Sequence, residues 1–187
     1  MKRRNFFILL LAAGVLAGAP WAVTQAVWTD SQDVTGNTFS TGSVDISTSP
    51  TSALVTFASM VPGDKVTAPL TVSNAGTMQL RYAMTTSITG STTLSDGLEL
   101  QIKSGVTTCN NASFDADGTS LYNSSLTAGA IGNPAAGSQA GDRTLNASAN
   151  EVLCFQVRLP SNASSTLQGL STTATFTFAA EQTANNP

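Results

Sequence analysis

Two runs of alternating apolar residues, separated by a short turn signal, place the strongest constraint on the fold of this chain. In residues 65–73, and again in residues 80–88, most of the side chains at every second position are apolar. A period of two is typical of strands that bury one face. Asn74-Ala75-Gly76 lies between the runs and tolerates a positive φ, so the pattern predicts a β-hairpin with a loop of roughly three to five residues. Pro69 cannot donate to a ladder, so we expect the first strand at a sheet edge or a bulge.

Four further stretches carry strand signals, and the sequence contains no long amphipathic helix. The stretches are residues 97–103, 121–126, 151–159 and 172–180. Residues 128–142 are rich in Gly, Ala and Pro and are expected to form a long surface loop. Short strands separated by turns predict an all-β fold, an antiparallel β-sandwich with long loops.

The first 26 residues have the parts of a secretory signal peptide. A basic start, Lys2-Arg3-Arg4, precedes an apolar stretch over residues 6–19, and Ala26 provides a small residue for cleavage. We therefore expect a signal helix over residues 1–26 that is cleaved between Ala26 and Val27. An uncleaved membrane anchor is the alternative, because the apolar stretch is almost long enough to span a bilayer.

Residues 27–40 are too polar for a core strand and have no helical period. They form either a loose terminus or a free segment with one aromatic anchor that pairs with another subunit. Phe39, Val44 and Ile46 are expected to anchor the first strand of the domain. We place the β-sandwich over residues 41–182 and a flexible tail over residues 183–187.

Several short motifs occur in a characteristic order along the chain. They are Val27-Trp28-Thr29-Asp30, Asn37-Thr38-Phe39, Gly42, Val44-Asp45-Ile46, Val61-Pro62-Gly63-Asp64, Asn74-Ala75-Gly76-Thr77, Leu80-Arg81-Tyr82, Gln168-Gly169 and the ending from Thr175 to Gln182. This order resembles the TasA/camelysin-like secreted proteins, which are exported with an unusual signal peptide that a dedicated signal peptidase cuts. The resemblance covers both ends and much of the first half, whereas residues 96–150 carry little of it. It implies a jelly-roll version of the sandwich, with an immunoglobulin-like sandwich as the related arrangement.

Cys109 and Cys154 are the only two cysteines. In an exported chain an even pair is most simply a disulfide, with two free thiols as the alternative. Cys154 alternates with Phe155 and shares its face with Gln156 and Arg158. The bridge is therefore expected on the outer face of the sheet, where it would hold an insertion around residues 107–114.

The sequence contains no histidine, which removes His-based triads and the usual zinc protease site. This matters because camelysin-type relatives are described as metalloproteases. Asp96 and Glu99 are interpreted as a turn residue and an outward strand residue rather than a catalytic pair. We expect no catalytic residue and no cofactor.

Asp115 and Asp117 precede Gly118 and imitate the start of a calcium-binding loop. The closing Glu of such a loop is missing, so a plain turn is the preferred interpretation. The two carboxylates are kept as a weak calcium candidate, and no other metal site is expected.

The charge balance excludes nucleic acid as a partner. The net charge is −3, and without Lys2, Arg3 and Arg4 five basic residues remain against eleven acidic ones, which gives −6. A nucleic-acid-binding protein usually carries a basic face.

The resemblance implies a secreted structural subunit of extracellular or biofilm-matrix fibres that assembles by donor-strand complementation. The donor would be residues 27–37, beginning at Val27, with Trp28 or Val34 filling pockets in the next subunit. The expected partners are further copies joined head to tail, the signal peptidase during export, and a possible matrix or anchoring accessory protein. A camelysin-like secreted metalloprotease and a monomeric cell-surface binding or accessory module are the alternatives.

Overall fold

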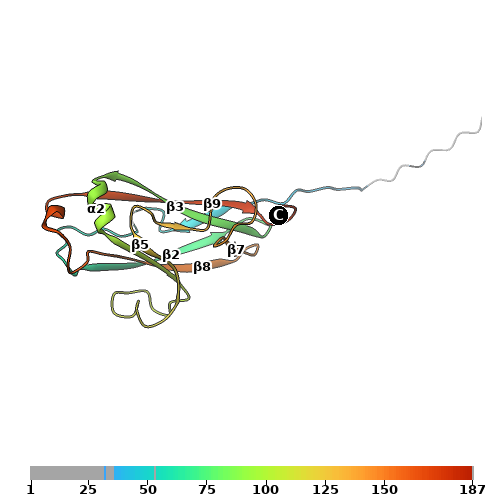
Figure 1. Ribbon diagram of the computed structural model, residues 1–187. Helices are drawn as coiled ribbons and strands as arrows, with labels where there is room; N and C mark the ends of the chain where they lie inside the picture. The colour runs from blue at the N-terminus through green and yellow to red at the C-terminus, as the bar shows by residue number, and fades with distance from the viewer. Residues whose placement is uncertain (1–31, 33–35, 53, 187) are drawn as a thin grey trace, which may run out of the picture. The chain divides into compact units, whose positions relative to one another are not determined.

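Figure 1 shows the computed structural model of the protein, which describes residues 32, 36–52 and 54–186. The chain divides into one unit up to Phe39 and another from Ser40 to Pro187. The described residues of the first unit lie in no strand and are exposed. Phe39 is 96% exposed, so the expectation that it anchors the first strand is wrong.

The second unit consists of two antiparallel sheets, which confirms the all-β prediction. The first sheet has the strand order β1 (Ile46–Ser49), β2 (Lys65–Asn74), β8 (Asn150–Arg158), β4 (Glu99–Ser104) and β5 (Thr119–Ser125). The second sheet is centred on β3 (Leu80–Gly90), which pairs with β9 (Thr172–Gln182), β6 (Ala130–Ile131) and β7 (Arg143–Leu145). A short helix α2 (Thr92–Gly97) and a 3-10 turn (Ser165–Leu167) complete the described elements.

The two sheets pack face to face as a β-sandwich, with β3 and β9 in one layer and β2 and β8 in the other (Figure 1). The fully buried side chains between them come from the inward positions of both layers, among them Leu80, Tyr82, Met84, Leu100, Ile102, Leu153 and Phe155. These are positions at which the alternating pattern placed the apolar face. In the part of the chain that the structure describes, no helix is long and apolar enough to cross a membrane.

The predicted hairpin between residues 65–73 and 80–88 is wrong, although both strands exist. β2 pairs with β1 and β8, whereas β3 pairs with β9 in the other sheet. The connection therefore crosses from one layer to the other. Asn74 fixes this crossing: its buried amide nitrogen donates to the carbonyls of Met78, Leu145 and Asn146 at 2.8, 3.1 and 3.0 Å.

The insertion between β4 and β5 lies on the outer face of the first sheet. In Figure 1 it hangs below the β2–β8 layer, away from β3 and β9. The disulfide from Cys109 to Cys154 joins it to β8, with the two Cα atoms 5.6 Å apart. Gln156 points outward as expected, yet only 2% of it is exposed. The buried ring of Phe114 also belongs to this insertion, with the Lys103 ammonium 4.8 Å from its centroid.

Candidate functional site: an open groove between the two sheets

A cavity of about 590 Å³ opens between the two sheets along one side of the sandwich. Its apolar lining comes from β2, β8 and β9, and the coil after β1 forms another wall: Val66, Leu70, Val157, Ala174, Phe176, Phe178, Leu54, Val55, Phe57 and Met60. None of its lining residues, in the described part of the chain, belongs to β3. The cavity therefore lies on the side of β9 that faces away from β3. We call this feature the open groove.

The strand β9 forms one wall of the open groove, and its main-chain edge on that side has no strand partner among the described residues. Ser171 and Thr183, just outside the two ends of β9, hydrogen-bond with the chain at the ends of β3: Ser91 N donates to Ser171 O at 2.9 Å, and Thr183 N donates to Gln79 O at 3.2 Å. Main-chain direction alternates along a strand, so odd-numbered residues of β9 face β3 and even-numbered residues face away. Within the described residues no strand pairs with this second edge.

The side chains of the same even-numbered residues point into the sandwich. Ala174, Phe176, Phe178 and Ala180 are packed against the core but are only partly buried. Phe176 lies against Phe155, with ring centroids 5.1 Å apart. The inward face of β9 is thus less completely buried than that of β3, where Leu80 and Met84 are fully covered.

The coil over residues 50–60, of which residue 53 lies outside the described part, runs along the open groove. Leu54, Val55 and Met60 pack against the core. Across the described residues, this coil belongs to no strand and makes no hydrogen bond. It is therefore held in place by apolar contacts.

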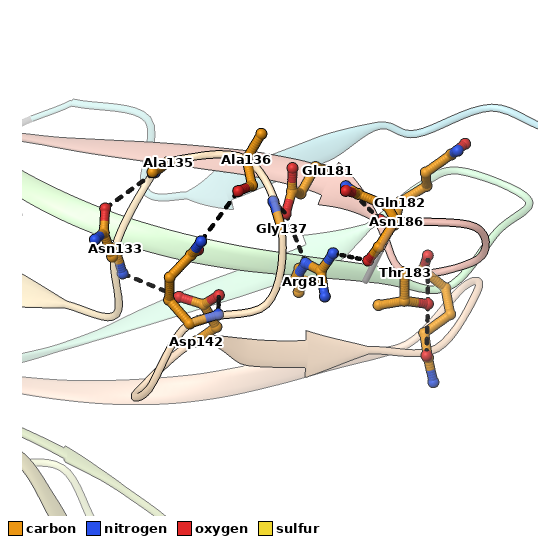
Figure 2. A network of polar contacts seen from close by, with 12 residues as sticks. Arg81, Asn133, Ala135, Ala136, Gly137, Asp142, Glu181, Gln182, Thr183 and Asn186 are labelled. Atoms are coloured by element: carbon orange, nitrogen blue, oxygen red, sulfur yellow. Dashed lines mark hydrogen bonds and ion pairs between the residues drawn. The ribbon is translucent and has the colours of Figure 1, made fainter.

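A polar network on the outer face of the second sheet fixes the far end of β9 to β3 (Figure 2). Only 6% of Arg81 is exposed. Its guanidinium donates to the Glu181 carboxylate at 2.6 Å and to the Asn186 carbonyl. Gly137 N, from the loop that covers this face, also donates to Glu181 at 3.0 Å. The hydrogen bond from Arg81, followed by one from Asn186, lowers the pKa of the Glu181 carboxyl. Residues 183–186, the described part of the expected tail, thus take part in hydrogen bonds of the domain.

A second network joins the two sheets inside the sandwich. The Tyr82 hydroxyl donates to the Glu151 carboxylate at 2.6 Å, and Arg143 Nε donates to the same carboxylate at 2.9 Å. Burial, and then the hydrogen bond to Glu151, raises the pKa of the Tyr82 hydroxyl. The bond to Glu151 likewise raises the pKa of Arg143. Each group has a partner, so this network is a structural tie between β3, β7 and β8.

The two carboxylates of the weak calcium candidate have different partners. Asp115 lies 3.3 Å from the Lys65 ammonium, whereas Asp117 accepts from the Thr107 N–H at 3.2 Å. The contacts with Thr107 lower the pKa of the Asp117 carboxyl. No group of three His, Cys, Asp or Glu residues suited to a metal occurs among the described residues. Calcium binding stays a weak alternative to the plain turn, to be tested by melting the protein with and without millimolar calcium.

The remaining predicted site residues, Ala26, Val27, Trp28 and Val34, lie outside the described residues. The strand signal over residues 172–180 predicts β9. It does not predict the open groove, because the sequence pattern of an edge strand does not reveal which of its two edges is paired. An absence of charge and proline from Thr172 to Ala180 was the available signal.

Comparison with known proteins places the chain in a family. The family described as camelysin metallo-endopeptidase matches residues 10–186. A search of curated proteins gave no match. The match begins within the signal-like start and extends over both sheets and the open groove, so it covers nearly the whole chain. This protein therefore belongs to the camelysin metallo-endopeptidase family.

Proposed function

We propose that this protein is a secreted structural subunit that assembles into extracellular fibres by donating a strand to its neighbour. The observation that carries the proposal is that no described strand pairs with one edge of β9, beside a cavity to which β9 contributes only partly buried apolar side chains. An extended segment of another chain adds to such an edge through main-chain hydrogen bonds, and pockets take its alternate side chains. A head-to-tail contact of this kind does not close on itself and gives filaments.

The proposed donor is the leading segment of another copy, residues 27–37. Trp28 and Val34 are six residues apart and therefore fall on one face of an extended strand, where both can enter the open groove. Residues 36–39 of the described chain lie in no strand and are exposed, so they add no strand to either sheet. Cleavage after Ala26 would free Val27 to enter a neighbour.

The family match and the signal-like start support export through a signal peptidase to the extracellular matrix or cell surface. A matrix or anchoring accessory protein is a further proposed partner. The low content of charged residues, 10%, leaves a surface rich in hydroxyl and amide groups rather than a basic one.

Truncation tests the donor role directly. The mature protein starting at Val27 is expected to form filaments visible by electron microscopy, and a variant lacking residues 27–33 is expected to stay a folded monomer. Circular dichroism and thermal unfolding check the fold, and size-exclusion chromatography checks the mass. Filaments formed by the truncated variant would refute strand donation, while a mature protein that stays monomeric at high concentration would favour the surface-module alternative.

A metal-dependent peptidase is the second candidate, because the matching family is described as a metallo-endopeptidase. Metal binding in this chain would depend on carboxylates, since the sequence has no histidine. Casein cleavage by the purified mature protein, with and without a chelator, separates the two candidates. Cleavage that the chelator abolishes would establish the peptidase, whereas we expect no cleavage in either condition.

A further inference from the structure

We infer that the incoming strand adds to the free edge of β9 and not to the unpaired part of the β2 edge, residues 65–70. The inference rests on the proposed function and specifies where assembly takes place. Both edges border the open groove, because Val66 and Leu70 line it from β2 and Phe176 and Phe178 line it from β9. The choice between them follows from their main-chain groups.

Only the first half of the β2 edge lacks a strand partner among the described residues. β1 pairs with residues 71–74 of β2, so residues 65–70 have a strand partner on the β8 side alone. Asn74 N donates to Ala149 O beside β8, whereas Ala75 N donates to Asp45 O on the β1 side. By alternation, odd-numbered residues of β2 direct their main-chain groups to the free side.

Two of the three free-side residues on β2 are blocked. The carbonyl of Lys65 already accepts from the Asn111 side chain at 2.9 Å. Pro69 has no N–H, which is tolerated at this position because β8 needs no donor from it. Thr67 alone offers both a free donor and a free acceptor. Obstructed ladders of this kind are how natural sheets discourage strand addition at an edge.

The β9 edge carries no such obstruction between Thr172 and Ala180. Five even-numbered residues direct both main-chain groups outward: Thr172, Ala174, Phe176, Phe178 and Ala180. This stretch contains neither proline nor charge, and none of these outward main-chain groups has a hydrogen bond within the described part of the chain. Only at Gln182 is a carbonyl taken, by the Asn186 side chain at 3.2 Å. The edge therefore offers an uninterrupted row of main-chain donors and acceptors from Thr172 to Ala180.

The strand pairings of the domain point to the same edge. In an immunoglobulin-type sandwich the sheets are A-B-E-D and C-F-G. Here β1-β2-β8-β4 correspond in pairing to A-B-E-D, and β3-β9 correspond to C-F. The position of G, beside F, is the free edge of β9. A donated strand at this position completes the second sheet and closes the open groove.

Proline substitution distinguishes the two edges. Ala174→Pro removes an N–H that faces the free edge and not β3, so the monomer is expected to fold. The Pro ring then blocks an incoming strand, and the concentration needed for filament formation rises by about tenfold or more. Thr67→Pro makes the same change on β2 and is expected to leave that concentration within about twofold of the wild type. Because Thr67 also accepts from Gln156 at 2.9 Å, Thr67→Ala serves as its matched control.

Amide hydrogen exchange provides an independent measurement on wild-type protein. The amides of Ala174, Phe176 and Phe178 should exchange rapidly in the monomer and become protected in the filament, whereas the amide of Thr67 should stay unprotected. The inference is overturned if Thr67→Pro abolishes assembly while Ala174→Pro does not, or if protection appears at Thr67 instead. Absence of filaments from the wild type would be a different failure, that of the proposed function itself.

Discussion

At the scale of single residues, the crossing between the sheets depends on one buried amide. Asn74 is 1% exposed, and its side chain serves four main-chain groups, because its Oδ1 also accepts from Gly76 N at 2.9 Å. The sequence identified Asn74 as a turn residue but not this role. Two of its acceptors, Leu145 and Asn146, lie about seventy positions away along the chain, and local sequence carries no information about such a partner.

Removal of this amide should be costly. Asn74→Ala leaves buried carbonyls without donors, and we expect a loss of about 2–4 kcal/mol in the free energy of unfolding. Asn123→Ala is the matched control, because Asn123 is exposed in β5. Urea denaturation of both variants checks the prediction, and similar losses for the two would show that the Asn74 bonds do not stabilise the crossing.

Glu181 makes stability depend on pH. Its pKa is lowered in the folded state by Arg81, so its contribution is present above the ordinary carboxyl pKa and is lost as the pH falls through the lowered value. Glu181→Gln should therefore be less stable than the wild type at neutral pH, with a difference that shrinks below the ordinary carboxyl pKa of about 4.3. Urea denaturation at several pH values measures this, with Asp96→Asn, at an exposed helix position, as the control. A difference that does not change with pH would exclude the pair as its source.

At the scale of elements, the alternating pattern located most strands and their inward faces but not all of their partners. β8 and β9 match residues 151–159 and 172–180 closely, because each has a clear period of two. The same period led to the wrong hairpin, since two neighbouring strands with one buried face each can pair within a sheet or face each other across a core. Which arrangement forms depends on contacts with β8 and β9, far away in the sequence.

The coil over residues 50–60 is expected to compete with the donated strand. Replacing Leu54 and Val55 with Ser weakens the apolar contacts that hold it, and filament formation should then begin sooner at equal concentration. Ala58→Ser is the control, because Ala58 is exposed in the same coil and does not line the open groove. Light scattering gives the lag time, and a longer lag in the double variant would indicate that the coil supports assembly.

The insertion between β4 and β5 should matter for stability and not for assembly. Cys109 and Cys154 are 45 residues apart, and replacing both with Ser is expected to lower the free energy of unfolding by about 4 kcal/mol in the chain-entropy description. The bridge lies on the outer face, away from the open groove. Filaments should therefore still form below the lowered melting temperature, and their complete loss there would place the insertion in the subunit contact.

At the scale of the whole molecule, the proposed assembly gives each subunit two different ends, a donor and an acceptor. A variant lacking residues 27–33 keeps the acceptor edge, and Ala174→Pro keeps the donor. Neither should polymerise alone at moderate concentration. When the two variants are mixed, the leading segment of the Ala174→Pro variant can add to the β9 edge of the truncated variant. The resulting pair cannot grow, because the truncated variant has no leading segment to donate and the remaining β9 edge carries the proline.

The mixture should therefore yield a one-to-one complex and stop, because a heterologous contact propagates only when every subunit carries both ends. Analytical ultracentrifugation of the mixture, compared with each variant alone, measures this outcome. The disulfide variant with wild-type donor and acceptor serves as the control, since it should form long polymers. A mixture that polymerises would show that subunits meet through a symmetric contact, and a mixture with no complex would show that the leading segment and the β9 edge are not partners.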